Sequence, residues 1–303
     1  MNQESNTFRK SLKSLPRLLG QVITIAAIAF LGWELHHQWD SVNAWRPTVG
    51  QGAIFIFLTL CYATGFLVLA RNWLTMVTAL VGTTLPTKPV LHSYTETQIA
   101  KYVPGNFMHL VSRHIYLKDL GVSHRPIAFA TMLELMTLPI AAVAALCFFL
   151  PFADLSQITG WEWEVIVVLW ALLAGGLSAG AFGLFWLGQK RLLRPMMIVL
   201  ARATGFMLIQ GALFGAVLSI TAGDFVYLAL PVAVLAWLVG FVTPGAPGGM
   251  AVREVVYVTF LSKAMASEDV LIAALIFRVM TILGDLTLYA FGRVFFSSHS
   301  RDV

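Results

Sequence analysis

The sequence predicts an all-α fold, a polytopic membrane helical bundle of about seven or eight transmembrane helices with two Pro/Gly-broken re-entrant segments. Apolar residues make up 58% of the 303 residues and charged residues 12%, against roughly 45–50% and 25% in soluble chains. Mean hydropathy is +0.79. A soluble domain of this size has too little interior to hide so much apolar surface. The composition therefore excludes a soluble enzyme, a nucleic-acid-binding module and a disordered chain.

The chain contains seven apolar stretches near the length of about 20 residues that a helix needs to cross the hydrocarbon core. The first follows a basic front but is too long for a signal-peptide core and lacks a small-residue cleavage site, so we interpret it as an uncleaved signal-anchor. We expect one integral membrane domain over 1–303, which can be divided into two related halves at about 1–150 and 151–303. The stretches are 18–36, 51–71, 126–150, 163–188, 196–220, 225–243 and 268–296.

The basic residues predict the orientation of these helices. They gather in alternate loops, at 9–17, 113–125 and 190–194, while the intervening loops are mainly acidic. Cytoplasmic loops carry the excess of Lys and Arg. We therefore expect a multi-pass protein of a bacterial-type inner (plasma) membrane with a cytoplasmic N-terminus, and we attribute the net charge of +5 to this asymmetry.

The side of the membrane that holds the C-terminus stays open. Seven crossings would leave it outside, whereas Arg293 and Arg301 favour the cytoplasm. An eighth crossing would have to come from 244–262, which is short and begins with Pro and Gly.

Two segments at membrane depth are too interrupted to be simple helices, one between about Thr75 and Tyr116 and one from Phe241 to Glu254. Proline removes a backbone donor and glycine permits positive φ, and such backbone is tolerated in a membrane only inside protein or beside a wet cavity. Each break has a Pro-Gly pair followed by an arginine, and matched broken helices point to a transporter's binding site. Ordinary Pro/Gly loops are the alternative. The crossing count puts both breaks on the cytoplasmic side, which favours a parallel repeat. The residues of the broken backbone are Pro104, Gly105, Pro244, Gly245, Pro247, Gly248 and Gly249.

Ionisable residues lie where the bilayer centre is expected. A central Arg or Asp costs about 2.5–3.5 kcal/mol on insertion scales, so these groups must face each other, backbone dipoles or water. We interpret them as a polar cavity in which three arginines bind an anionic head group and three carboxylates balance them, because the guanidinium matches phosphate and stays charged when buried. A purely structural ion-pair network is the alternative. The candidate substrate-binding residues are Arg113, Glu134, Arg253, Glu254, Arg278 and Asp285.

Other signals are weaker. The seven histidines do not form a zinc-ligand pattern, so we expect no metal and no other cofactor. No nucleophile elbow or phosphate loop is present, so we assign no catalytic residue. Segment 88–103 looks amphipathic and is expected along the cytoplasmic face. Gly176-x-x-x-Gly180 and Gly211-x-x-x-Gly215 predict close helix packing.

These features resemble the lysylphosphatidylglycerol synthase transmembrane-region family, the flippase-like membrane half of the multiple peptide resistance factor. The resemblance implies a multi-helix fold with re-entrant segments that moves lipids or lipid-linked sugars between leaflets. It does not imply lysyl transfer, which belongs to a separate soluble domain. The second Pro-Gly pair, at Pro247, departs from the family pattern. The matching stretches are 101–113, 120–123, Glu134, 247–254 and 277–278.

The sequence therefore favours a lipid translocase, not an enzyme, that moves an anionic phospholipid or a polyprenyl-phosphate-linked lipid. Two alternatives stay open: a non-catalytic scaffold or regulatory subunit of an envelope lipid or glycan enzyme, and an intramembrane lipid-modifying enzyme using Glu134, Glu254 or His109. The expected partners are membrane lipids with an anionic head group. A homo-oligomer, and a complex with a glycosyltransferase or a lipid-synthesis enzyme, are both compatible with this function. No nucleic acid is expected as a partner.

Overall fold

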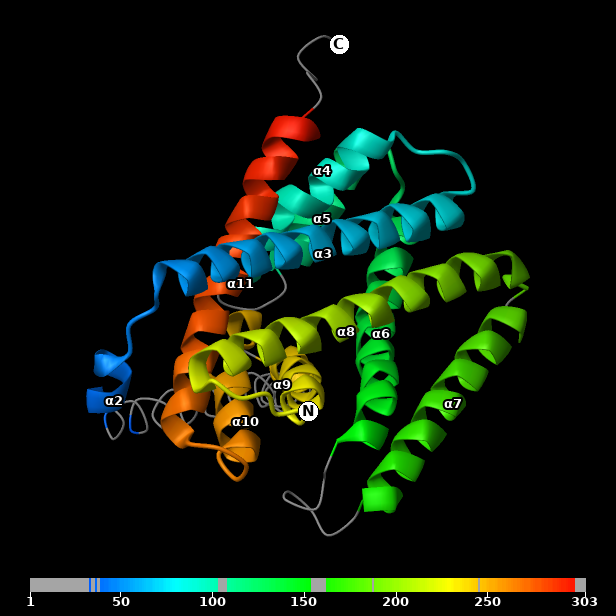
Figure 1. Ribbon diagram of the computed structural model, residues 1–303. Helices are drawn as coiled ribbons and strands as arrows, with labels where there is room; N and C mark the ends of the chain where they lie inside the picture. The colour runs from blue at the N-terminus through cyan, green and yellow to red at the C-terminus, as the bar shows by residue number, and fades with distance from the viewer. Residues whose placement is uncertain are drawn as a thin grey trace, which may run out of the picture.

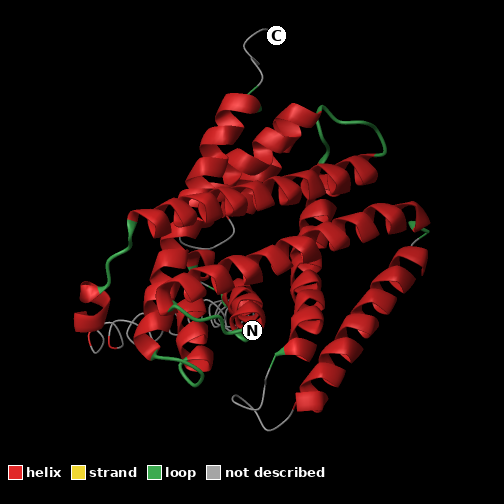
Figure 2. Cartoon of the chain, viewed as in Figure 1, coloured by secondary structure: helices red, strands yellow, loops and turns green. Residues whose placement is uncertain are grey.

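The computed structural model describes residues 39–102, 108–153, 162–186, 188–244 and 246–297, together with Trp33 and His36. The described chain is all-helical and contains no strand (Figure 2). The α-helices are α2 (Trp39–Ala44), α3 (Val49–Val81), α4 (Thr87–Thr97), α5 (Met108–Asp119), α6 (His124–Phe149), α7 (Glu162–Trp186), α8 (Leu193–Ala222), α9 (Ala229–Val242), α10 (Val252–Leu261) and α11 (Ser267–Phe295). Four short 3-10 turns join them: η1 (Gln98–Tyr102), η2 (Leu150–Phe152), η3 (Lys190–Leu192) and η4 (Pro247–Gly249).

Five of these helices are long and apolar enough to cross a membrane, namely α3, α6, α7, α8 and α11. They correspond to five of the seven predicted stretches. The first stretch, 18–36, lies outside the described residues apart from Trp33 and His36. The remaining stretch, 225–243, forms α9, which has 14 residues. At 1.5 Å per residue it is about 21 Å long, shorter than the core of about 30 Å, so a full crossing there is not confirmed.

Helix α3 is longer than its apolar stretch predicted. It begins at a capping box in which Thr48 and Gln51 satisfy each other's backbone amides. It ends 33 residues later at Gly82, whose φ of 82° terminates the helix in the left-handed conformation. The first broken segment therefore starts at Gly82 and not near Thr75.

Helix α4 does not lie along a surface as its amphipathic pattern suggested. Seven of its eleven residues are buried, and α4 packs against α3, α5 and α11. Its polar side chains are satisfied locally, as when Thr97 Oγ1 donates to the Ser93 carbonyl oxygen at 2.6 Å.

The helices on either side of α7 form two sets with the same order of elements. The set α3, α4, η1, α5, α6 and the set α8, α9, η4, α10, α11 each consist of a long helix, a short helix, a 3-10 turn, a second short helix and a long helix. The packing partners also correspond, since α3 packs against α11 as α8 packs against α6, and α4 against α11 as α9 against α6. The two leading helices, α3 and α8, lie against each other.

Glycines allow the long helices to approach closely. A Cβ at Gly284 of α11 would overlap the Tyr62 ring of α3, and one at Gly292 would overlap the Thr95 side chain of α4. On α8, a Cβ at Gly211 would lie 2.9 Å from the Leu230 carbonyl oxygen, as expected for tight packing.

Helix α7 is peripheral. It runs beside α6 at the edge of the molecule (Figure 1), and Leu173 is the only buried residue in its described part. Cβ atoms built at Gly176 and Gly180 would meet nothing within 4 Å, so the first glycine pair is not a packing contact among the described residues.

Candidate functional site

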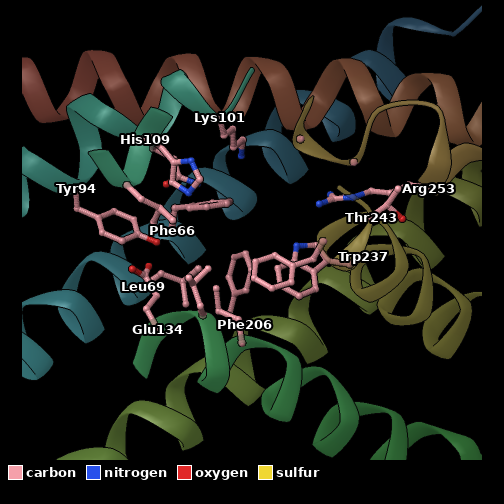
Figure 3. Close-up of a pocket in the computed structure, with 18 of the residues that line it drawn as sticks. Phe66, Leu69, Tyr94, Lys101, His109, Glu134, Phe206, Trp237, Thr243 and Arg253 are labelled. Carbon is pink, nitrogen blue, oxygen red and sulfur yellow. The ribbon is translucent and has the colours of Figure 1, made fainter. Parts of the chain in front are cut away.

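A cavity of about 380 Å³ lies where the two broken segments meet. Proteins bind small ligands in pockets of roughly 300–1,000 Å³. Its polar groups gather at the ends and along one side, and aromatic rings lie between them (Figure 3). Glu134 and Tyr94 lie toward one end, and Arg253 and Thr243 toward the other. The wall includes Phe66, Gln98, Lys101, His109, Arg113, Phe206, Trp237, Gly240, Gly248 and Gly249.

Arg113 is fully buried and its charge is compensated. Its Nη1 donates to Glu134 Oε2 at 2.7 Å and its Nη2 to Gln98 Oε1 at 3.4 Å. The guanidinium carbon also lies 3.9 Å from the centroid of the Tyr94 ring and 4.8 Å from that of Trp73, within the range of cation–π attraction. This pair joins α5 to α6 and forms one end of the cavity.

Arg278 and Asp285 lie on α11 and are not part of the cavity wall as the structure describes it. Arg278 Nε donates to Glu254 Oε1 at 2.6 Å, and its two terminal nitrogens donate to the carbonyl oxygens of Gly248 and Gly249 at 3.3 Å. Glu254 is thus a partner of Arg278, and together they hold the second broken segment.

Asp285 holds the first broken segment. Its Oδ2 lies 2.7 Å from Lys101 Nζ and accepts a hydrogen bond of 2.5 Å from the Tyr102 hydroxyl. The Asp285 side chain has no exposed surface, so this ion pair is fully desolvated on the aspartate side. One helix, α11, therefore anchors both broken segments two turns apart.

Arg253 differs from the other three cations. Within the described residues it forms no ion pair and no hydrogen bond, and its Nε is buried without a partner. Its guanidinium carbon lies 5.8 Å from the Trp237 ring centroid, and the side chain points toward the cavity (Figure 3). Arg253 is the one uncompensated cation in the described wall.

Two glycines hold Arg253 in this position. A Cβ at Gly240 of α9 would lie 2.8 Å from Arg253 Cγ, and one at Gly249 would lie 2.6 Å from Arg253 Nε. The Cα atom of each glycine is also 3.1 Å from the Cβ position of the other. The Arg253 side chain therefore passes between Gly240 and Gly249, where a Cβ atom on either residue would overlap it.

The backbone before Arg253 takes unusual conformations. Gly248 and Gly249 have φ of 59° and 70°, and Ala251 has φ of 65° with ψ of −40°. The two glycines adopt positive φ at no steric cost, whereas Ala251 is strained. This turn reverses the chain after α9 and places the start of α10 behind the cavity.

The two broken segments contact each other. A Cβ at Gly248 would lie 3.1 Å from Cε1 of Tyr102, the last described residue before the first Pro-Gly pair. Of the predicted broken-backbone residues, Pro104, Gly105 and Gly245 lie outside the described residues, and the side chain of Pro247 is not described. Pro244, Gly248 and Gly249 line the cavity.

His109 also lines the cavity, and its Nδ1 is buried without a hydrogen-bond partner in the described chain. His109 therefore presents a polar ring nitrogen to the cavity for which no described residue is a partner.

The sequence interpretation missed several residues of this site. Lys101, Tyr102 and Gln98 come just before the first Pro-Gly pair, and this position could have identified them. Trp237, Phe66 and Phe206 lie within apolar helices, where the sequence gives no sign that an aromatic ring faces a cavity.

Comparison with protein-family models and with curated proteins finds no match to this chain.

Proposed function

We propose that this protein is a membrane lipid translocase that moves a lipid with an anionic head group between leaflets. The observation that carries the proposal is Arg253, which lines the cavity, has its Nε buried without a partner and forms no ion pair with any described residue. An unpaired buried charge costs several kcal/mol, and an anionic ligand removes that cost. Arginine suits this role because its fork matches phosphate oxygens.

The cavity also reaches the outer apolar surface of the bundle, which favours a lipid over a water-soluble anion. Leu135 of α6 lines the cavity and is 40% exposed, and Pro244 beyond α9 is exposed as well. Apolar Met132 and Met136 flank Leu135 on that surface. An anionic head group can occupy the cavity while its tail leaves through this side into the surrounding lipid.

The two matched sets of helices support transport by alternating access. We infer that α4–α5 and α9–α10 are re-entrant hairpins, because each is too short to cross and each follows one long helix and precedes another. A single crossing, α7, separates the sets, so the second set must run in the opposite direction to the first. Inverted repeats with broken helices at a central site are typical of secondary transporters.

This arrangement replaces the parallel repeat that the sequence suggested and assigns the C-terminus to the cytoplasm. Leu80, Arg125 and Arg191 line one groove, so the end of α3 and the starts of α6 and α8 share one basic end of the bundle. Arg293, near the end of α11, pairs with Glu96 of α4, which lies next to that end. By the positive-inside rule this end is cytoplasmic.

The motif resemblance to the lysylphosphatidylglycerol synthase transmembrane-region family agrees with a lipid substrate. The residues that carry it, from Lys101 to Arg113 and from Pro247 to Glu254, are those on both sides of the cavity. The resemblance does not name the lipid, and the proposal rests on the cavity.

The proposal is tested by lipid movement in vesicles that contain the purified protein and a fluorescent anionic phospholipid. The wild-type chain should move lipid well above the rate in empty vesicles, and Arg253→Gln should lower that rate at least tenfold. Arg202→Gln is the matched control, since Arg202 is exposed and its only described hydrogen bond is to Thr75 at 3.4 Å. Wild-type vesicles that move lipid no faster than empty ones would overturn the proposal, and a lipid extract with altered chemistry would identify an enzyme instead.

A further inference from the structure

We propose that the protein also binds an anionic phospholipid at a second site, as a resident lipid that is not moved between leaflets. The site is a groove of about 630 Å³, here called the basic groove, between the end of α3, the first turns of α6 and η3. It shares no described residue with the wall of the central cavity. The inference goes beyond the proposed function, because a resident lipid here does not depend on what the cavity transports. The groove is lined by residues that include Leu80, Arg125, Phe129, Met132, Gln189 and Arg191.

Two arginines give the basic groove an uncompensated positive charge. Arg125 forms no hydrogen bond and no ion pair with any described residue. Arg191 has one described hydrogen bond, in which its Nε donates to Gln189 Oε1 at 3.4 Å. No acidic residue lines the groove in the described part of the chain. Guanidinium groups match phosphate oxygens, so the groove is suited to a head group with a net negative charge.

An apolar track continues from the arginines along α6. Arg125, Phe129 and Met132 follow each other at spacings of four and three residues, which places them on one face of the helix. Met132 is 44% exposed. The track from Arg125 to Met132 is about 10 Å long at 1.5 Å per residue, about a third of the hydrocarbon core of about 30 Å. A cationic end followed by such a track matches a phosphate followed by the first part of an acyl chain.

The place of this track favours a membrane lipid over a soluble anion or a soluble protein. Helix α6 is long and apolar enough to cross a membrane, so side chains one to two turns after Arg125 are within reach of acyl chains. A soluble phosphate would contact the arginines and leave Phe129 and Met132 uncovered. Basic pockets between transmembrane helices are known binding sites for anionic lipid head groups.

A lipid in the basic groove would contact the leading helices of both matched sets. Leu80 lies near the end of α3, Arg125 in the first turn of α6, and Arg191 in η3, directly before α8. A Cβ at Gly82, where α3 ends, would lie 3.4 Å from Arg191 Nη1, so η3 packs close to α3. A ligand that binds the folded state stabilises it, and this lipid should therefore hold the three helix ends together.

The test is photocrosslinking of the full-length protein in vesicles. The probes are phosphatidylglycerol and phosphatidylcholine with the same diazirine-bearing acyl chain, and mass spectrometry measures the label on residues 125–132 and on α7. Helix α7 contains no Lys or Arg and only one of its described residues is buried, so its label reports bulk lipid. Relative to α7, label on 125–132 should be at least about fivefold higher with phosphatidylglycerol, the effect of one basic residue near an anionic surface.

Matched variants separate the basic groove from its surroundings. Replacing both arginines, Arg125→Gln with Arg191→Gln, should bring the preference to within about twofold of that on α7. Lys190→Gln is the control and should leave it unchanged, since Lys190 precedes Arg191 but lies over the Phe185 ring, with its Nζ 4.1 Å from the centroid, and does not line the groove. Phosphatidylglycerol in detergent should raise the unfolding temperature of the wild type more than that of the double variant.

A second variant keeps the test valid if the double variant does not fold. Ala128 is exposed and lines the groove, and Ala128→Trp fills the apolar track while both arginines remain. It should also reduce the preference for phosphatidylglycerol.

Three results would overturn the proposal. Equal relative labelling by the two lipids would show that the groove does not select an anionic head group. Displacement of the label by excess glycerol 3-phosphate would identify a site for soluble phosphates. Loss of the label in Arg253→Gln would show that the groove only supplies lipid to the cavity. None of these results bears on the proposed function, because lipid movement is measured separately in the vesicle assay.

Discussion

Three of the four cations at the site form ion pairs with carboxylates, and Arg253 does not. The sequence predicted the charged residues of the site better than it predicted their partners. Glu134, Arg278 and Asp285 were expected to need compensation because of their depth, and all three are paired. Arg278 and Asp285 lie two turns apart on α11, and each contacts a different broken segment. Sequence spacing gives the face of a helix but not the element opposite it, so Lys101 could not be assigned to Asp285 in advance.

The Lys101–Asp285 pair provides a test at the scale of single residues. We predict that Lys101→Met and Asp285→Asn each lower the free energy of unfolding by about 3–5 kcal/mol, because each leaves one buried group without its partner. The double variant should be more stable than the Lys101→Met single variant, since both charges are then gone. Thermal unfolding in detergent, monitored by circular dichroism, measures all three. Additive losses in the double variant would show that the two side chains do not interact.

The short helices were more difficult to predict from the sequence than the long ones. The long helices follow from apolar length, and five of the predicted stretches correspond to the long apolar helices. Segment 225–243 was predicted to cross from its apolar composition, yet only 14 of its residues form helix α9, because apolar composition does not fix where a helix begins and ends. Helix α4 looked amphipathic, yet seven of its eleven residues are buried. The buried hydroxyls of Ser93, Thr95 and Thr97 donate to carbonyl oxygens of the same helix, so its polar composition did not indicate exposure.

Adding a single methyl group to α9 at Gly240 should strongly reduce lipid movement. Gly240→Ala introduces a Cβ at 2.8 Å from Arg253 Cγ and should therefore displace that arginine. We predict a loss of lipid movement of at least tenfold, although alanine favours the helix by about 1 kcal/mol over glycine. Gly205→Ala on α8 is the matched control, since its Cβ would meet nothing within 4 Å. A Gly240→Ala variant with the wild-type rate would show that the position of Arg253 is not critical.

At Ala251, in the turn after α9, we predict that removing a methyl group does not destabilise the protein. Ala251 has a φ of 65°, and a strained backbone conformation costs on the order of 1–3 kcal/mol that glycine would not pay. Loss of one buried methyl group costs about 0.8 kcal/mol. We expect Ala251→Gly to leave the unfolding temperature unchanged or to raise it.

Ala203→Gly is the control for this effect. Ala203 is equally buried on α8, but in a regular helix, where glycine costs about 1 kcal/mol relative to alanine. Its unfolding temperature should fall. Equal decreases in the two variants would mean that Ala251 carries no strain.

For the molecule as a whole, the two broken segments and the arginines after them could be predicted from the sequence, but the spatial relation between the segments could not. Counting 225–243 as a crossing made the two halves parallel and left the C-terminus undecided. Arg293 pairs with Glu96, where α11 meets α4. If α9 is part of a hairpin, as we propose, the second set is inverted and the C-terminus lies on the cytoplasmic side.

Cysteine accessibility tests this arrangement in intact cells or oriented vesicles. In a background in which Cys61 and Cys147 are replaced, a cysteine at Lys263 should react with a membrane-impermeant reagent from outside. A cysteine at Ser297 should react only after the membrane is opened. Both positions are exposed. The parallel arrangement predicts the reverse at both sites, so reaction of Ser297→Cys from outside would refute the inverted repeat.

Helix α7 packs little, yet in the proposed topology it determines the orientation of every helix that follows it. A set with two crossings and one hairpin begins and ends on the same side of a membrane, so two such sets joined directly would insert in the same sense. One added crossing turns the second set over. The chain cut between Ala153 and Glu162, with α7 left on the second piece, should reassemble from its two fragments.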